Sequence, residues 1–282
     1  MTPDLAPKLL GIGTNLVLQR SLGTPCLLHQ ILAISAQHLA HLRPDRCQFY
    51  SRQAVQLQTK AIELFNATQI IDKTNCEATI LFVGLLNRHL LIDVLGNREG
   101  DAAAFLERFI RSAQVQRGIR VIYNKTSTIL LESDLAPLVR EGSWAATRSS
   151  TVGKECDMLR QLISITPALD PIAKEACRTA VHFLQVGFDE LAQSPRADNV
   201  FRLIFCWGAY FPNEFFDLLS QRRPEAVAVL GWYAVLLDSG RTHWAIGDAA
   251  VFVLRSVSCF LGPEWAHWLQ WPMEMLADRL PE

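Results

Sequence analysis

Residues 78–95, ATILFVGLLNRHLLIDVL, form the most apolar long stretch of the chain. Their length and their apolar residues on every side predict a buried helix at the centre of the fold. Four polar side chains interrupt the stretch, namely Asn87, Arg88, His89 and Asp93. Because an unpaired polar group is costly to bury, each of the four must be satisfied by a neighbour or used in chemistry.

The overall composition is that of a globular protein without a strong excess of acidic or basic residues. Of 282 residues, 50% are hydrophobic, and 27 basic residues against 28 acidic ones give a net charge of -1. This balance argues against a basic surface, so we expect no direct contact with nucleic acid. Arg88 and Asp93 interrupt the best apolar run, so we also expect no membrane span. Without a recognisable signal peptide, we expect a cytoplasmic protein, or a nuclear one if it is regulatory.

The motif search disfavours metal and cofactor chemistry. Seven cysteines are scattered singly without a CxxC pair, which is typical of free thiols in a reducing compartment. His38 and His41 lie three residues apart, but no third ligand follows at suitable spacing, so we expect no metal site. The sequence lacks GxGxxG, P-loop, GxSxG and HExxH motifs. Any catalysis would therefore be free of cofactors.

Apolar residues recur at helical spacing along the chain, and good strand alternation is absent. Residues 119–131 have the β-branched content of a strand, but a lone strand would lack a partner, so we predict a helix. We expect Asp101 to cap the preceding helix and Gly118 to end it. The sequence predicts one all-α, bundle-like domain over residues 1–282, with about ten to twelve helices around an internal apolar pocket. The expected helices cover residues 25–42, 44–65, 78–96, 101–118, 119–131, 155–165, 171–192, 200–210, 224–237, 243–260 and 264–276, with a loop over 141–154.

Two stretches resemble parts of a known domain. Residues 27–46, LLHQILAISAQHLAHLRPDR, resemble the opening of the C-terminal effector domain of fungal binuclear-zinc-cluster transcription factors, sterol-uptake regulator type. Residues 231–272, GWYAVLLDSGRTHWAIGDAAVFVLRSVSCFLGPEWAHWLQWP, resemble the ending of that domain, including its spaced tryptophans. The match in order and spacing covers nearly the whole chain. The resemblance implies an all-helical domain with an apolar pocket for a sterol-like ligand.

The chain departs from this family in two ways. The six-cysteine zinc cluster that precedes the domain in the regulators is absent, and the chain begins with its own Met1. We therefore expect a standalone protein without a DNA-reading module. The central helix of the family is usually apolar and small where this chain has Asn87, Arg88 and His89. This second departure favours chemistry over plain ligand binding.

Three residues are candidates for acid–base catalysis. His89 and Asp93 are four residues apart, so they share a face of the predicted helix. An aspartate can fix the tautomer of a histidine and hold it charged, which suits proton transfer. Alternatively, the two form a satisfied core pair or an exposed pair at the helix end. Asp248 follows Gly247 and is either an acid at the pocket mouth or the cap of the next helix.

Aromatic and large apolar residues are candidates for holding a flat hydrophobic ligand or for stabilising a developing cation. Alternatively, they are simply core residues. The candidate ligand-binding residues are Phe82, Leu86, Trp207, Tyr210, Phe211, Trp232 and Tyr233.

These observations support two functions of different class. The first is a cofactor-independent isomerase or cyclase of fungal secondary metabolism. It would act on a hydrophobic small molecule in an enclosed pocket, for example by epoxide opening and cationic rearrangement. This interpretation rests on analogy with cofactor-free rearrangement proteins. The second is a non-enzymatic regulatory domain that binds a sterol or terpenoid. Tryptophans near the C-terminus are candidates for contacts in a homodimer.

Overall fold

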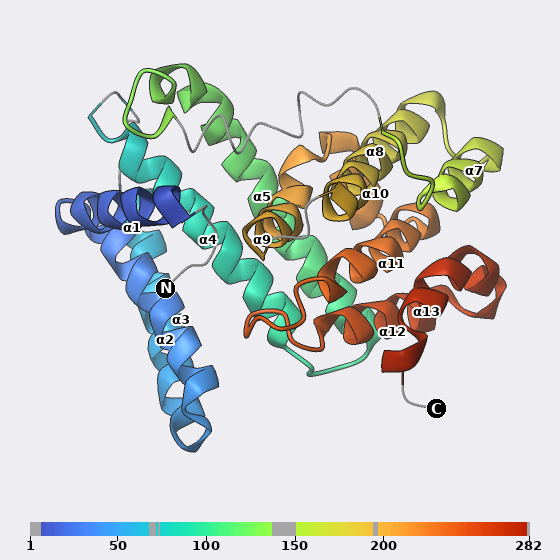
Figure 1. Ribbon diagram of the computed structural model, residues 1–282, viewed down its shortest axis with the longest axis horizontal. Helices are drawn as coiled ribbons and strands as arrows, with labels where there is room; N and C mark the ends of the chain where they lie inside the picture. The colour runs from blue at the N-terminus through green and yellow to red at the C-terminus, as the bar shows by residue number, and fades with distance from the viewer. Residues whose placement is uncertain (1–6, 68–71, 73, 137–150, 194–196, 281–282) are drawn as a thin grey trace. The chain divides into compact units, whose positions relative to one another are not determined.

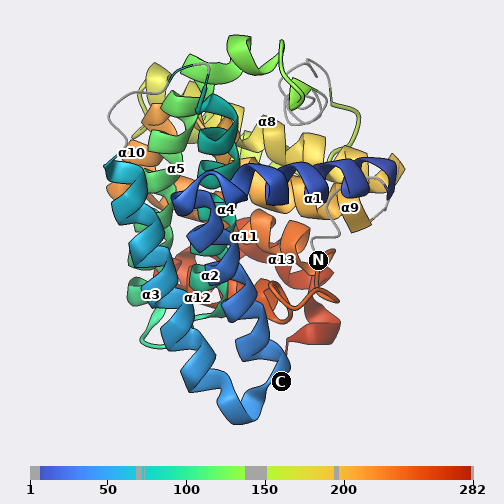
Figure 2. The ribbon, with the colours of Figure 1, turned by 90° about the vertical axis from the view of Figure 1, so that its left-hand side faces the viewer.

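The computed structural model describes residues 7–67, 72, 74–136, 151–193 and 197–280, seen from two sides in Figures 1 and 2. Within these ranges it contains twelve α-helices and no strand, which confirms the predicted all-α class. Residues 141–150 of the predicted loop lie outside the described residues. The helices are α1 Pro7–Leu22, α2 Pro25–Leu42, α3 Cys47–Asn66, α4 Cys76–Gly96, α5 Ala102–Leu130, α7 Asp157–Ile165, α8 Pro171–Gln193, α9 Ala197–Cys206, α10 Asn213–Ser220, α11 Pro224–Asp238, α12 Ala249–Leu261 and α13 Gln270–Met275. Short 3-10 turns occupy Pro44–Arg46 (η1), Trp207–Tyr210 (η3), Pro263–Leu269 (η4) and Ala277–Arg279 (η5).

Local sequence explains where several helices begin. Pro25 and Pro224 are the first residues of α2 and α11, where the missing N–H of proline would have had no partner within the helix. Pro171 begins α8 in the same way, and Asp170 caps it by accepting a hydrogen bond of 2.7 Å from the backbone N–H of Ala173. The helix starts are therefore encoded within a few residues.

Several predicted helix boundaries are wrong, two of them by a wide margin, and α1 and α10 were not predicted. α5 continues through Gly118 to Leu130, so residues 119–131 form no separate element. A glycine inside a helix costs about 1 kcal/mol, which neighbouring turns of a long helix can offset. The helix expected from His243 begins only at Ala249. Gly247 has a φ of 51°, which lies outside the right-handed helical region.

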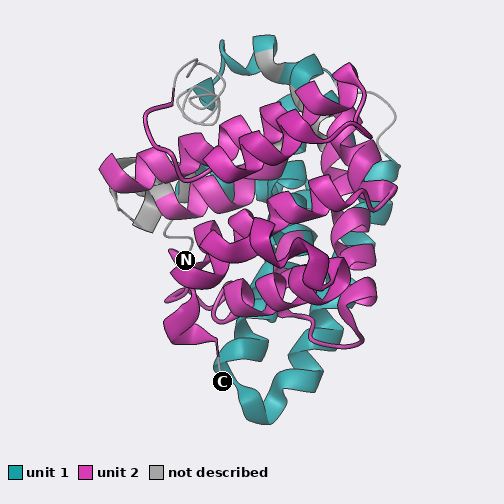
Figure 3. Cartoon of the chain, turned by 90° about the vertical axis from the view of Figure 1, so that its right-hand side faces the viewer, with its two compact units in different colours: residues 1–90, 118–143 teal, residues 91–117, 144–282 magenta. Residues whose placement is uncertain are grey.

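The chain divides into two compact units, which Figure 3 shows in different colours. Unit 1 comprises residues 1–90 and 118–143, and unit 2 comprises residues 91–117 and 144–282. The boundaries cross α4 and α5, so each of these helices contributes residues to both units. Whether the two units form one domain, as the sequence predicts, stays a prediction.

Unit 1 contains an antiparallel hairpin of α2 and α3, joined by the turn at η1 (Figure 2). Small side chains let the two helices approach closely, and α4 adds its apolar residues to the same core. Phe65 of α3 stacks on Phe82 of α4 with ring centroids 4.6 Å apart. The buried alanines of the hairpin are Ala33, Ala36, Ala54 and Ala61.

Unit 2 is built around α11, which is buried at every position from Glu225 to Ala234. α7, α8, α10, α12 and α13 all contribute residues to contacts with α11 or α8. α4, which the sequence predicts to be the central helix, is less completely covered. It is the one described helix long and apolar enough to suit a membrane span, and 61% of its most apolar window is buried inside the protein.

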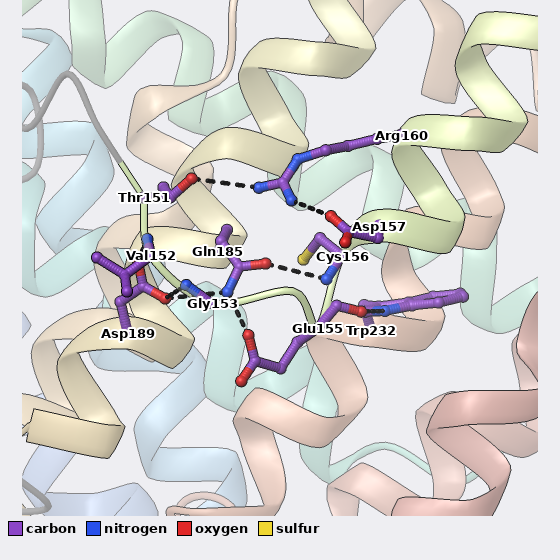
Figure 4. A network of polar contacts seen from close by, with 10 residues as sticks. All are labelled: Thr151, Val152, Gly153, Glu155, Cys156, Asp157, Arg160, Gln185, Asp189 and Trp232. Atoms are coloured by element: carbon purple, nitrogen blue, oxygen red, sulfur yellow. Dashed lines mark hydrogen bonds and ion pairs between the residues drawn. The ribbon is translucent and has the colours of Figure 1, made fainter.

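A network of polar contacts holds residues 151–157 against α8 (Figure 4). The carboxylate of Asp189 accepts hydrogen bonds from the backbone N–H groups of Val152 and Gly153, each 2.8 Å long. Gln185 accepts a 3.0 Å bond from the backbone N–H of Cys156 and donates to Asp189 at 3.0 Å. We call this arrangement the Asp189 clasp. It pairs backbone groups of a non-helical segment that would otherwise lack partners.

Two further contacts tighten the Asp189 clasp. Trp232 of α11 donates its ring N–H to the backbone carbonyl of Glu155 at 2.9 Å, and Gln185 donates to the Glu155 side chain. A Cβ atom added to Gly153 would collide with side-chain atoms of Glu155, Gln185 and Asp189. The clasp therefore requires glycine at this position, because these side chains are held by their own hydrogen bonds.

We predict that Asp189→Ala lowers the free energy of unfolding by about 2–4 kcal/mol, because it leaves two backbone N–H groups without acceptors. Urea denaturation followed by circular dichroism measures the change. Arg160→Ala is the matched control, since Arg160 makes only a surface ion pair of 2.6 Å with Asp157 and a long contact with Thr151. Its cost should stay below about 1 kcal/mol. Equal costs for the two variants would contradict the clasp.

Candidate functional site

His89 lies on α4 in unit 1, where its side chain is only 1% exposed. Gln30 of α2, which is fully buried, donates from Nε2 to His89 Nδ1 at 3.1 Å. An amide nitrogen can only donate, so Nδ1 accepts and the neutral ring carries its proton on Nε2. Gln30 therefore fixes the tautomer of His89, a role that the sequence assigned to Asp93.

Burial lowers the pKa of His89 to about 4. A buried imidazole loses hydration most strongly in its charged form, so the ring is neutral at pH 7. A neutral imidazole is not the charged proton donor that the sequence led us to expect. The catalytic role of His89 stays a prediction, and at neutral pH it concerns the neutral ring.

Gln30 is a residue that sequence reasoning missed. Its Oε1 atom is buried and has no hydrogen-bond partner among the described residues. The only signal in the sequence is a single glutamine within the apolar run LLHQILAIS. Its partner lies 59 residues away, so spacing along one helix could not pair them.

Asp93 lies one turn after His89 on α4 and is exposed to solvent. The protein around it nevertheless removes enough water to raise the pKa of its carboxyl group to about 7. Asp93 is therefore close to half protonated at neutral pH, which suits a group that both donates and accepts protons. A direct contact between Asp93 and His89 stays a prediction.

Asp248 occupies the N-cap position of α12, but its side chain makes no capping hydrogen bond. Its carboxylate instead forms a 2.5 Å ion pair with Arg98 of unit 2, and the side chain of Asp248 is 80% exposed. The guanidinium of Arg98 also lies 4.3 Å from the ring centroid of Phe252 and donates to the backbone carbonyl of Leu95. Asp248 thus anchors the chain after α4 to α12.

Five of the six predicted aromatic residues lie in unit 2, where they stack on several different rings. The ring of Trp207 stacks on that of Tyr233, with centroids 4.3 Å apart. It also makes an edge-on contact with the ring of Phe211, with centroids 4.5 Å apart. Tyr210 is half-buried and stacks on a different ring, that of Phe183.

The polar atoms of the buried aromatic residues are already paired inside the protein. Tyr233 donates its hydroxyl to the Ile204 carbonyl at 3.0 Å, and burial raises the pKa of this phenol. Trp207 donates its ring N–H to the Ala180 carbonyl at 3.3 Å. Trp232, bonded to Glu155 in the Asp189 clasp, stacks on Trp271. Such pairing is typical of core aromatic residues.

Two cavities of unit 2 lie beside Trp207, one of them next to Tyr210 and the other next to Phe211 and Tyr233. Each has about 10 Å³ of free space, enough for about one water molecule. A drug-sized ligand needs a pocket of roughly 300–1,000 Å³. Phe82 and Leu86 lie in the core of unit 1. Ligand binding by these predicted residues stays a prediction.

The outer face of α2 carries a row of exposed apolar residues. Leu32, Leu39 and Leu42 are 44%, 37% and 55% exposed, and Ser35 lies exposed between them. We call Leu32, Ser35, Leu39 and Leu42 the outer stripe. No Asp, Glu, Lys or Arg occurs in α2. An apolar and uncharged exposed row of this kind indicates an interaction surface.

The outer stripe faces away from α4. Gln30 marks the side of α2 that faces α4, because it bonds to His89. Residues of the stripe lie about 120–200° around the helix from Gln30. Val55 of α3 is also exposed. It lies seven residues, about two helical turns, before Ile62, so both residues lie on the same face of α3. Ile62 packs in the unit 1 core with α4, so this face is directed towards α4. Val55 therefore lies on another side of the hairpin from the stripe.

Comparisons with known proteins found no matching family model, no matching curated protein and no matching solved structure. The likeness to fungal effector domains is therefore carried by the two sequence stretches alone. What that likeness implies about ligand and function remains a proposal.

We predict that the free energy of unfolding falls as the pH falls from 6.5 to 4 on account of His89. The unfolded ring binds a proton near its ordinary pKa of 6.5, whereas the folded ring stays neutral until about pH 4. The loss should reach at most about 3 kcal/mol. Urea denaturation across this pH range, with His89→Gln beside the wild type, measures it.

His89→Gln should flatten this fall, and His41→Gln, which replaces an exposed histidine on α2, is the matched control. The raised pKa of Asp93 acts with the opposite sign, because its stabilising effect is lost as the pH rises through about 7. The difference between wild type and variant isolates His89. An unchanged slope in His89→Gln would refute a neutral buried ring.

Proposed function

We propose that this protein is a non-enzymatic regulatory module that binds a partner through the outer stripe of α2. The observation that carries the proposal is the row of exposed leucines on a helix without a charged residue. Exposed apolar rows are costly to keep in water unless a partner covers them. The resemblance to fungal effector domains supports a regulatory role.

Features of the interior favour this function over catalysis in an enclosed pocket. The two cavities beside Trp207 have room for about one water molecule each. His89 is neutral and its tautomer is set by Gln30. The hydroxyl of Tyr233 and the ring N–H of Trp207 are already bonded to backbone carbonyls. Few of these polar groups are therefore available to a hydrophobic substrate.

A reporter assay tests the regulatory function. We expect residues 1–282, fused to a monomeric DNA-binding module, to change transcription of a reporter gene severalfold. Leu39→Asp should abolish the change, because a charge in the middle of the outer stripe prevents dry contact. Val55→Asp is the matched control, since Val55 is equally apolar and more exposed but lies off the stripe. Equal behaviour of the two variants, or no change in transcription by the wild-type fusion, would refute the proposal.

A second candidate function is the cofactor-free isomerase, with Asp93 as its acid–base group. One observation favours it, namely an exposed carboxyl group whose pKa is raised to about 7. A carboxylic acid with this pKa can protonate an epoxide oxygen, and its carboxylate can then remove a proton from the rearranged cation. The overall reaction is an isomerisation and needs no other reactant.

Conversion of a lipophilic epoxide to its rearranged isomer, followed by mass spectrometry after chromatography, tests this second function. We expect the rate to depend on a group with a pKa near 7 and to fall at least a hundredfold in Asp93→Asn. Asp248→Asn is the matched control, because that carboxylate is exposed and paired with Arg98. A turnover rate that survives Asp93→Asn would exclude Asp93 as the acid–base group.

A further inference from the structure

We propose that the closed end of the α2–α3 hairpin binds the surface of an anionic lipid membrane. We call residues 42–52 the hairpin tip, which runs from the end of α2 through η1 into the first turns of α3. The inference goes beyond the proposed function, and of the outer stripe it uses only Leu42. Three observations support it: the position of the tip, its charge and the apolar side chains among its arginines.

The hairpin tip lies away from the core of unit 1. The hairpin residues that pack in this core fall within 26–31 of α2 and 61–65 of α3. Leu42 comes eleven residues after Ile31, which places it about 16 Å farther along α2. In Figure 2 the turn at η1 is the end of the hairpin farthest from α1. A flat surface can therefore meet the tip without first meeting the helices of the unit 1 core.

The hairpin tip has a local excess of positive charge, although the whole chain has a net charge of -1. Arg43, Arg46 and Arg52 are exposed, and Asp45 is the one acidic residue of the tip. Within the ranges that the structure describes, no carboxylate pairs with any of these three arginines. A guanidinium group without such a partner suits phosphate, to which it can donate two parallel hydrogen bonds.

Two exposed apolar side chains lie among these arginines. Leu42 is 55% exposed and Phe49 is 49% exposed. The guanidinium of Arg46 lies 5.0 Å from the ring centroid of Phe49 and 5.3 Å from that of Tyr50. Arg52 follows Phe49 by three residues, so it lies on the same side of α3. The apolar ring of Phe49 therefore has two arginines as its charged neighbours.

This combination of charge and apolar surface favours a membrane as the occupant. At a membrane, arginines reach the headgroup phosphates while leucine and phenylalanine side chains enter the edge of the acyl region. A nucleic acid offers phosphates, but it leaves Leu42 in water. An apolar protein surface covers Leu42 and Phe49, but it removes water from the guanidinium groups without giving them a partner. An anionic lipid surface provides both kinds of contact.

The number of arginines sets the expected preference for anionic lipid. Each arginine near an anionic surface strengthens binding roughly fivefold, so three strengthen it by up to roughly a hundredfold. One leucine and one phenylalanine add only a small apolar contact. We therefore expect reversible binding at the membrane surface, which added salt weakens because it screens the arginines.

Flotation of the full chain with lipid vesicles tests the proposal. The vesicles contain phosphatidylcholine and phosphatidylserine in equal parts, and pure phosphatidylcholine vesicles serve for comparison. At low salt we expect at least about tenfold stronger binding to the mixed vesicles. The triple variant Arg43→Gln/Arg46→Gln/Arg52→Gln should lose this preference. Equal binding of the wild type to both kinds of vesicle, or a preference that survives in the triple variant, would overturn the proposal.

Two matched pairs of variants locate the contact at the hairpin tip. Arg52→Gln should weaken binding severalfold, whereas Lys60→Gln should leave it unchanged, because Lys60 is paired with Glu63 at 3.1 Å and lies about 12 Å farther along α3. Phe49→Ala should weaken binding even at high salt, whereas Val55→Ala should not. Circular dichroism of each variant confirms that it is folded. Equal effects within either pair of folded variants would exclude the tip as the contact.

Two further measurements separate a membrane from other anions. Soluble glycerophosphoserine, which has the headgroup without acyl chains, should not displace the protein from the mixed vesicles. If the chain binds duplex DNA through these arginines and does not bind the vesicles, the tip recognises a nucleic acid and the membrane proposal falls. The arginine variants leave the outer stripe intact, so the flotation experiment and the reporter assay can fail independently.

Discussion

The hydrogen bond from Gln30 to His89 joins two helices of unit 1 that also share an apolar core. It is one case of the constraint on which both units depend, namely that polar groups removed from water must be paired inside the protein. In unit 2 the carboxylate of Asp189 meets this demand for the backbone of a non-helical segment. The hydroxyl of Tyr233 is paired in the same way, because it donates to the backbone carbonyl of Ile204. Apolar packing drives the helices together. The polar pairs decide which packed arrangement gives these buried groups a partner.

The surface of α2 differs from the packed aromatic residues of unit 2 in leaving apolar side chains exposed. The aromatic residues of unit 2 pack on one another, and the cavities among them have room for about one water molecule each. On α2, by contrast, apolar side chains face solvent without a charged residue nearby on the helix. The energetic cost of that exposure is removed when a partner covers the row. Asp93 is the notable exception, since it combines exposure with a pKa near neutrality.

Helices could be predicted where their signals are local. Pro25, Pro224 and the pair Asp170–Pro171 mark helix starts within a few residues, and the structure has helices there. Gly118 misled the prediction because its intrinsic penalty is small compared with the contacts of a long helix. The start of α12 was missed because it depends on the backbone conformation of Gly247, which residue type alone does not specify.

The all-α class, most helix positions and the spacing of His89 and Asp93 by one helical turn could be predicted from the sequence alone. Helical periodicity and capping depend on residues a few positions apart, so both can be recognised in the sequence. The pairing of Gln30 with His89, of Arg98 with Asp248 and of Trp207 with Tyr233 became visible only in the folded chain. These outcomes depend on residues far apart in the chain. Burial and pairing between such residues arise only when the helices pack.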